Sequence, residues 1–236
     1  MKLRIAGMEK SFGSKQVLDN LQYTFEQGRI YGLLGRNGAG KTTLFNCLSG
    51  EIRADGGKVL LEDSQGLSRE LQPEDIGYVF SLPILPEFLT GYEFVRFYMD
   101  LHPNAAKAGQ TPESYLDLVR LSEEDRYRLI KDYSHGMKNK IQILCFLIAK
   151  PPVILLDEPL TSFDVVVAHE MKQLLLDIKK DHILIFSTHL LQLAAELCDD
   201  AVLLNKGTLT PIAAERLKDK GFEAELVELL KEESHG

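Results

Sequence analysis

The sequence predicts an α/β fold in which helices pack on a largely parallel sheet. Short apolar runs rich in Val, Ile and Leu are separated by stretches long enough for a helix, a pattern typical of buried parallel strands. These runs are residues 29–34, 58–61, 76–80, 153–156, 182–186 and 201–204. Residues 83–149 are instead mostly helix-compatible, with helix starts expected at Thr111-Pro112 and Ser122-Glu123-Glu124. We therefore expect a layered α/β domain that carries a helical insertion.

The two ends of the chain have patterns of their own. Residues 1–28 alternate apolar and polar side chains around a turn signal at Phe12-Gly13-Ser14-Lys15, which predicts a small antiparallel sheet. Residues 211–233 have the pattern of two short helices. We therefore expect a single domain at 1–210, with the insertion at about 83–149, and a helical tail at 211–236.

Composition excludes several classes of function. The formal net charge is −8, whereas a dedicated nucleic-acid surface normally has clustered Lys and Arg, so we expect no nucleic-acid partner. Cys47, Cys145 and Cys198 lack metal-ligand spacing and are expected to be free thiols in a reducing compartment. The richest apolar stretch, 143–149, is shorter than the roughly 18 residues of a membrane span. We therefore expect a soluble chain whose membrane role would need a partner.

The segment Gly35-Arg36-Asn37-Gly38-Ala39-Gly40-Lys41-Thr42 fits the pattern G-x-x-x-x-G-K-[ST] at each fixed position. It follows a predicted strand and precedes a helical run, as the pattern requires. Glycines let successive backbone N–H groups turn around phosphate oxygens at a helix N-terminus. We expect Lys41 to reach the β and γ phosphates of a nucleotide and the Thr42 hydroxyl to hold Mg²⁺. The alternative is a glycine-rich turn with an incidental lysine.

A second pattern is the apolar run 153–156 that ends in Asp157 and Glu158. Side chains alternate along a strand, so the two carboxylates leave its end in different directions and can take different roles. Asp157 suits the Mg²⁺ shell, and Glu158 suits a general base that polarises the attacking water. The alternative is a strand that runs into an acidic turn before Pro159.

Three further segments narrow the class of nucleotide hydrolase. They are Tyr133-Ser134-His135-Gly136-Met137 before a helical run, Thr161-Ser162-Phe163-Asp164 after the carboxylates, and Ser187-Thr188-His189 at the end of the next strand. In this order and spacing the chain resembles the nucleotide-binding subunits of ABC transporters over residues 2 to about 210. The resemblance implies the ABC ATPase fold: a P-loop NTPase core, an N-terminal antiparallel β subdomain and a helical insertion.

The resemblance also implies roles for individual residues. Phe12 would stack on adenine, His189 would contact the γ phosphate, and Asp164 of the D-loop would cross a dimer interface. Asp157 would end the Walker B strand, before the catalytic Glu158. The Walker A residues would be Gly35, Arg36, Asn37, Gly38, Ala39, Gly40, Lys41, Thr42 and Thr43.

The signature motif implied by the resemblance is Ser134, His135 and Gly136, which would complete the ATP site of the opposite subunit. Ser134 can cap a helix whose N–H groups and dipole face an anion. A γ phosphate held between one subunit's loop and the other subunit's helix would keep the dimer closed until hydrolysis. The alternatives are that Ser134 only caps a helix and that His189 and Phe12 are structural.

Three positions depart from the family pattern. His135 replaces the first glycine of the signature, Ser81 stands at the Q-loop position where glutamine is usual, and the D-loop reads Ser162-Phe163-Asp164. The hydrolytic set of Lys41, Thr42, Asp157, Glu158 and His189 is intact. We therefore expect an ATPase whose turnover is slow or depends on a partner, with a heterodimer that has one weak site as the alternative.

The leading interpretation is the ATPase subunit of an export system, using ATP and Mg²⁺ at the cytoplasmic face of the membrane. Its expected partners are a transmembrane permease subunit and a second ATP-binding subunit. The Gly-Met signature ending resembles ABC-2 exporters, and Phe88, Phe94, Phe97 and Tyr98 are candidates for a docking groove. Those aromatics could instead pack inside the insertion. The competing interpretations are a soluble ABC switch and an ATP sensor that scarcely hydrolyses ATP.

Overall fold

The computed structural model describes residues 1–80, 82–103, 109–159, 165–217, 219 and 221–222. The chain divides into two compact units. The first unit consists of the described residues of Met1–Tyr78, Pro152–Glu158 and Lys179–Gly236. The second unit consists of those of Val79–Pro151 and Pro159–Ile178.

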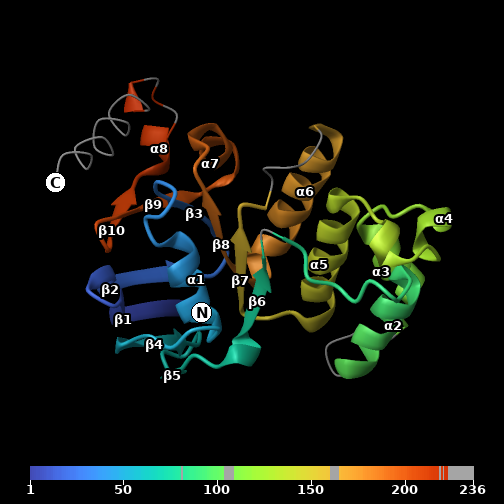
Figure 1. The fold of residues 1–236 in the computed structure, drawn as a ribbon, viewed down its shortest axis with the longest axis horizontal. Helices are drawn as coiled ribbons and strands as arrows, with labels where there is room; N and C mark the ends of the chain where they lie inside the picture. Colours follow the sequence, from blue (N-terminus) through green and yellow to red (C-terminus); the bar gives the residue numbers. More distant parts are fainter. Residues whose placement is uncertain (81, 104–108, 160–164, 218, 220, 223–236) are drawn as a thin grey trace. The chain divides into compact units, whose positions relative to one another are not determined.

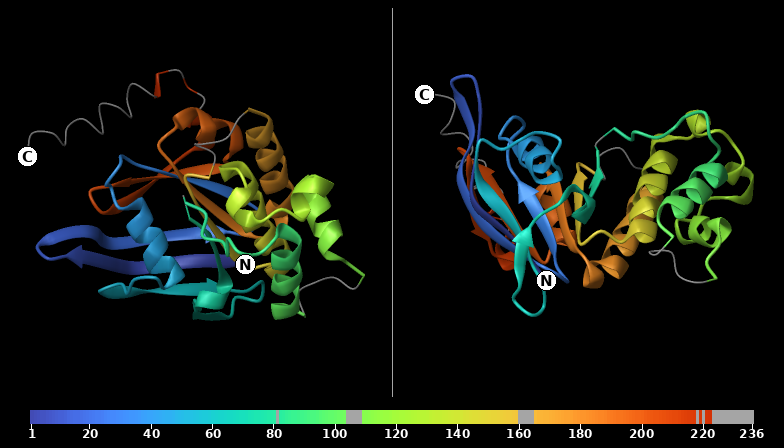
Figure 2. Two further views of the ribbon diagram at one scale, coloured as in Figure 1. Left: turned by 45° about the vertical axis from the view of Figure 1, so that its right-hand side comes forward. Right: turned by 90° about the horizontal axis from the view of Figure 1, so that it is seen from below.

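An antiparallel sheet forms one layer of the first unit. Within the described residues its strand order is β2-β1-β4-β5. The bounds are Lys2–Phe12 for β1, Lys15–Glu26 for β2, Gly56–Glu62 for β4 and Ser68–Glu70 for β5. The alternating residues Leu3 and Ile5 of β1 are buried, and they pair with Phe25 and Tyr23 of β2. The two long strands run side by side as a ribbon, which confirms the antiparallel sheet predicted from residues 1–28 (Figure 2).

A second sheet has the order β10-β9-β3-β8-β7-β6 in the described part of the chain (Figure 1). Strands β9, β3, β8 and β7 pair in parallel, and β10 joins β9 antiparallel. All residues of β3, β7 and β8 are buried, which explains their largely apolar sequence. The bounds are Ile30–Leu34 for β3, Ile76–Val79 for β6, Val153–Asp157 for β7, Ile183–Thr188 for β8, Asp200–Asn205 for β9 and Thr208–Ile212 for β10.

Two apolar clusters lie on opposite sides of strand β3, because successive side chains of a strand point to opposite faces. Leu33 packs in one cluster with Leu44 and Phe45 of α1, which spans Lys41–Ser49. The next residue, Leu34, packs in the other cluster with Ala194 of α7, which spans Leu191–Leu197. The cluster of Leu33 also contains the buried side chains of β1 and β2, so it joins the two sheets of the first unit.

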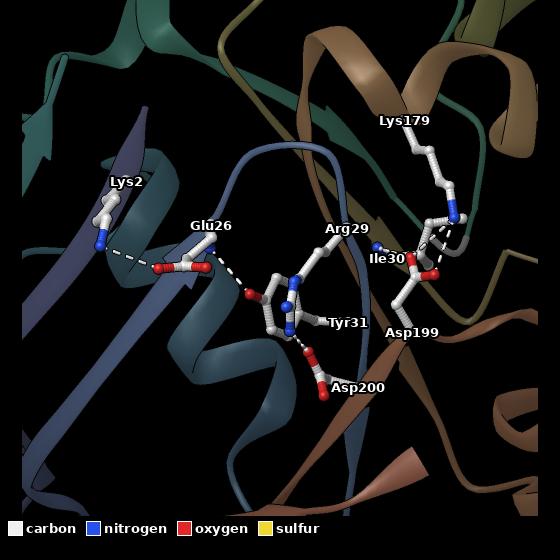
Figure 3. A network of polar contacts seen from close by, with 8 residues as sticks. All are labelled: Lys2, Glu26, Arg29, Ile30, Tyr31, Lys179, Asp199 and Asp200. Carbon is white, nitrogen blue, oxygen red and sulfur yellow. Dashed lines mark hydrogen bonds and ion pairs between the residues drawn. The ribbon is translucent and has the colours of Figure 1, made fainter. Parts of the chain in front are cut away.

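Polar groups connect the end of β2 with the amino ends of β1, β3 and β9 in the first unit, and Figure 3 shows them together. The Tyr31 hydroxyl accepts the Glu26 N–H at 2.9 Å, and the Asp199 carboxylate accepts the Ile30 N–H at 2.8 Å. Three ion pairs complete this amino-end network: Lys2 with Glu26, Arg29 with Asp200, and Lys179 with Asp199. Lys179 belongs to the short helix η3, Lys179–Asp181.

The second unit is helical in its described residues. Helices α2, α3 and α4 begin after Thr90, Thr111 and Ser122, whose hydroxyls accept a backbone N–H three residues later. The two predicted helix starts at Thr111-Pro112 and Ser122-Glu123 are therefore confirmed. The bounds are Gly91–Leu101 for α2, Pro112–Leu118 for α3, Glu123–Arg126 for α4, His135–Ala149 for α5 and Val165–Ile178 for α6, with short helices η1 at Pro73–Asp75 in the first unit and η2 at Ile130–Asp132.

The prediction of a helix that begins at Pro211 is wrong. Pro211 and Ile212 instead end strand β10, where Ile212 pairs with Ala201 of β9 and is buried. Proline is tolerated there because β10 is at the edge of the sheet, where a missing N–H leaves no ladder partner unsatisfied. The expected domain boundary at residue 210 falls inside this strand. A short helix, α8, follows at Ala214–Leu217.

Candidate functional site

The glycine-rich loop joins β3 to α1 at the carboxyl end of the parallel strands (Figure 1). Gly40 precedes α1 with a left-handed φ of 105°, and no side chain caps the helix. A Cβ on Gly40 would lie 2.8 Å from Cγ1 of Val17, so only glycine fits. Arg36, Asn37 and Gly38 are exposed, whereas Gly35 is buried. The first N–H groups of α1 are thus left without a side-chain acceptor, which favours an anion.

Lys41 lies beneath this loop. It is 7% exposed, and its Nζ donates to the carbonyl oxygens of Gly35 at 2.8 Å and Arg36 at 3.2 Å. Burial lowers the pKa of Lys41, while the charges of Glu158 and Asp157 act in the opposite direction. The ammonium group is therefore fixed against the loop and desolvated, which strengthens its interaction with any phosphate bound there.

Thr42 and Asp157 meet between the start of α1 and the end of β7. The Thr42 hydroxyl donates to Oδ2 of Asp157 at 3.0 Å, and the Ser187 hydroxyl donates to Oδ1 at 2.5 Å. Asp157 is 6% exposed, and Thr42 is exposed. Mg²⁺ in proteins is usually held by one or two oxygen side chains together with substrate phosphates and water. A hydroxyl and a carboxylate oxygen side by side, next to a loop that favours anions, fit that donor set.

Glu158 and His189 form a second pair. Nδ1 of His189 lies 3.0 Å from Oε1 of Glu158, a distance at which a ring N–H donates to a carboxylate. Glu158 has a left-handed φ of 52°, and its N–H donates to the Ser187 hydroxyl at 3.1 Å. Such backbone is uncommon for a residue with a side chain and is often found at functional sites. The two neighbouring carboxylates have different side-chain partners, His189 for Glu158 and Thr42 for Asp157.

The remaining predicted site residues lie elsewhere. Phe12, at the end of β1, is 53% exposed, and Nζ of Lys10 lies 5.4 Å from its ring centroid. Ser134, in the second unit, is the N-cap of α5, and its hydroxyl accepts the Met137 N–H at 3.2 Å. His135 and Gly136 begin that helix, so the predicted cap is confirmed.

The structure thus brings together Lys41, Thr42, Asp157, Glu158 and His189 within the first unit. The Q-loop position Ser81 and the D-loop residue Asp164 lie outside the described residues. The sequence prediction gave no role to Ser187, although its hydroxyl contacts both acidic residues. Ser187 lies inside the buried strand β8, so its sequence position alone gave no signal. Its role follows only from the pairing that places it opposite Asp157.

Among the described residues, no helix is both long and apolar enough to cross a membrane. The protein family described as ABC transporter matches residues 18–161, a range that includes the glycine-rich loop and both acidic residues. The chain belongs to the ABC transporter family. The resemblance to its ATP-binding subunits is thereby confirmed, and ATPase is the enzyme class of this family.

Similar proteins from other organisms support the same assignment. An uncharacterized ABC transporter ATP-binding protein of Nostoc sp. is 36% identical over 81% of this chain and 58% of its own length. A sulfate/thiosulfate import ATP-binding protein of Acinetobacter baylyi is 31% identical over 92% of this chain and 63% of its own length. A fluoroquinolones export ATP-binding protein of Mycobacterium tuberculosis is 32% identical over 89% of this chain and 70% of its own length. The chain therefore spans about three fifths of the first two relatives.

Solved structures establish the fold. The ATP-binding subunit of an ABC transporter superposes with a TM-score of 0.79 at 24% identity, over 98% of this chain and 100% of that one. A dimeric ATP-binding cassette in a post-hydrolysis state, bound to ADP and Pi, gives a TM-score of 0.76 at 21% identity, over 90% of this chain and 98% of that one. The predicted ABC ATPase fold is confirmed.

Proposed function

We propose that this chain binds MgATP at the carboxyl end of the parallel strands of its first unit and hydrolyses it to drive export through separate membrane subunits. The observation that carries the proposal is the arrangement around Asp157. One carboxylate oxygen meets Thr42 beside the uncapped start of α1, and the adjacent Glu158 meets His189. Binding and hydrolysis of a nucleoside triphosphate need these two sets of groups next to each other.

The phosphates would lie against the N–H groups of the loop 35–40 and of the first turn of α1. Lys41, already held at the loop carbonyls, would exchange those acceptors for β and γ phosphate oxygens. Thr43, in the first turn of α1, would add its own N–H. The exposed ring of Phe12 would stack on the adenine, with its charged neighbour Lys10 close to the same ring.

Thr42 and Asp157 would hold Mg²⁺, which neutralises charge on the β and γ phosphates when bound. Glu158 would accept a proton from the attacking water or orient it, because its carboxylate meets His189 and not Thr42. His189 would contact the γ phosphate through Nε2, since Nδ1 is engaged by Glu158. The pair therefore fixes the imidazole orientation from one side and leaves the other nitrogen for substrate.

A second ATP-binding subunit would complete the site. Ser134 caps a helix of 15 residues, so the N-terminus of α5 carries the positive end of a helix dipole. His135 and Gly136 lie in its first turn. We propose that these residues contact the γ phosphate bound by the opposite subunit, with Asp164 at the same interface, and that the bulk of His135 slows closure.

The membrane partner would dock on the second unit. Phe88 and Phe97 are 79% and 53% exposed, whereas Phe94 is buried and Tyr98 is half-buried. Exposed aromatic side chains of this kind suit an apolar helix from a permease subunit at the cytoplasmic face of the membrane. Only part of the aromatic set named from the sequence is thus accessible for docking.

Export rather than import is supported by two observations. The signature segment ends in Gly-Met, which resembles ABC-2 exporters, and the fluoroquinolone export relative covers 89% of this chain. The sulfate/thiosulfate import relative, at a similar identity, makes import the competing direction. Transport by inverted membrane vesicles distinguishes them, because ATP added outside drives uptake into inverted vesicles only for an exporter.

The hydrolytic part is tested by phosphate release from the chain alone and from the chain purified with a co-expressed membrane subunit. Wild type and Glu158→Gln are compared in both states. We expect turnover that rises with the partner and collapses in the variant. A turnover rate that is the same with and without the partner would contradict the transport role. A turnover rate that Glu158→Gln leaves unchanged would contradict the assigned base.

A further inference from the structure

Ser187 occupies a position between the two acidic residues of the site. It is fully buried in β8, and its backbone lies directly opposite Asp157 in the parallel pairing of β7 with β8. Its hydroxyl makes two hydrogen bonds of opposite sense. It donates to Oδ1 of Asp157 at 2.5 Å and accepts the Glu158 N–H at 3.1 Å.

We propose that Ser187 is a positioning residue: its hydroxyl orients the Asp157 carboxylate and also holds the Glu158 backbone in its observed conformation. This inference rests on the proposed function of the site. The hydroxyl engages one oxygen of Asp157, so the other oxygen, Oδ2, faces Thr42 and the expected Mg²⁺ position. Partners of this kind orient a metal-ligating carboxylate, and their loss typically costs about 10–100-fold in metal affinity or activity.

The same hydroxyl supports an unfavourable backbone conformation. Glu158 has a φ of 52°, which L-residues with a side chain adopt rarely. The Ser187 oxygen satisfies the N–H at that turn, which would otherwise be left without this acceptor beside a buried strand end. Removing the hydroxyl therefore loosens Asp157 and Glu158 at once, although Ser187 itself contacts neither nucleotide nor water in this scheme.

A serine is suited to this place because it combines a donor and an acceptor on one short side chain. Alanine removes both functions and leaves the strand intact. Threonine keeps the hydroxyl and is favourable in a strand, so it is the conservative variant. Tyr31→Phe is the matched control, because it also removes a buried hydroxyl that accepts a backbone N–H in the first unit, away from the site.

The test is equilibrium binding of a fluorescent, non-hydrolysable ATP analogue to the full chain, with Mg²⁺ and with EDTA, for wild type, Ser187→Ala, Ser187→Thr and Tyr31→Phe. We expect Ser187→Ala to bind the analogue with wild-type affinity in EDTA. The increase in affinity that Mg²⁺ gives should be smaller in Ser187→Ala than in wild type by about tenfold or more. Ser187→Thr should recover most of that gain, and Tyr31→Phe should keep all of it. In phosphate release, Ser187→Ala should lower kcat more than it raises KM.

The outcomes separate the inference from the function on which it rests. A wild-type chain that gains nothing from Mg²⁺ contradicts the proposed function. A wild-type gain that Ser187→Ala retains overturns the role of Ser187 alone. Equal loss of binding in Mg²⁺ and in EDTA would show general damage and also overturn it, as would a folded Ser187→Thr chain as defective as Ser187→Ala.

Discussion

The two ends of the parallel strands in the first unit differ in how far their charged side chains are buried. At the amino end, the network of Figure 3 consists of ion pairs whose members are 28–50% exposed and whose charges satisfy one another. At the carboxyl end, Lys41, Asp157 and Ser187 are almost fully buried, and Glu158 has left-handed backbone. Burial of charge and backbone strain both cost stability, so their concentration at the carboxyl end supports the proposed site there.

Replacing the carboxylate at each end should give the largest contrast. Glu158→Gln removes the expected general base, so turnover should fall by about 100-fold or more, while folding changes little. Glu26→Gln removes a carboxylate from the amino-end network and should leave turnover unchanged. Phosphate release under saturating ATP measures both. Equal loss of turnover in the two variants would remove the distinction between the ends.

Two glycines with left-handed backbone allow a second comparison. Gly40 has a φ of 105°, and an added Cβ would meet Val17, whereas Gly28, at the amino end, has a φ of 88° and open space around it. Gly28→Ala should cost only the backbone strain of about 1–2 kcal/mol and keep nucleotide affinity. Gly40→Ala should add overpacking of about 1–3 kcal/mol and reduce affinity for an ATP analogue about tenfold or more.

Affinity and urea unfolding, measured on the same preparations, check this pair of variants. Normal affinity in a folded Gly40→Ala chain would show that the loop does not need its observed backbone to hold phosphate.

Tyr31→Phe should produce a modest effect confined to stability. The variant removes the hydroxyl that accepts the Glu26 N–H, so the free energy of unfolding should fall by about 0.5–1.5 kcal/mol. Urea unfolding measures this, and phosphate release should stay at the wild-type rate. A slower ATPase in this variant would mean that the amino-end network is coupled to the site.

The smallest expected effect depends on pH. The hydrogen bond and charge of Lys2 hold the pKa of Glu26 below its usual range. A carboxylate with a lowered folded-state pKa stabilises the fold above its unfolded pKa of about 4.3, and that contribution is lost as pH falls through the lowered value. Lys2→Gln should therefore be slightly less stable than wild type at pH 7 and equal to it near pH 3, as followed by thermal unfolding. A difference that grows toward pH 3 would contradict this assignment.

The sequence predicted the strands well because buried parallel strands are continuous apolar runs. It failed at β10, where Pro211 and a polar pattern resemble a loop or helix start, and only the edge position explains the strand. Phe94 and Phe97 also looked alike in sequence. Their different burial follows from which face of α2 packs against neighbouring helices.

The structure brings together the residues named from motifs that fix both residue type and spacing, namely Lys41, Thr42 and the acidic pair. Contacts that depend on strand pairing were not predictable. Ser187 meets Asp157 because β7 and β8 pair in one particular register, and a shift by one residue would send its hydroxyl to the other face.

The most direct test of the distinction between the two ends is hydrogen exchange of the Glu158→Gln chain with and without MgATP. Peptides covering residues 35–44 and 153–158 should become protected, and peptides covering 26–30 and 199–200 should not change. This result would place the nucleotide at the carboxyl end of the strands. Protection confined to the amino-end peptides, or absent from both ends, would contradict it.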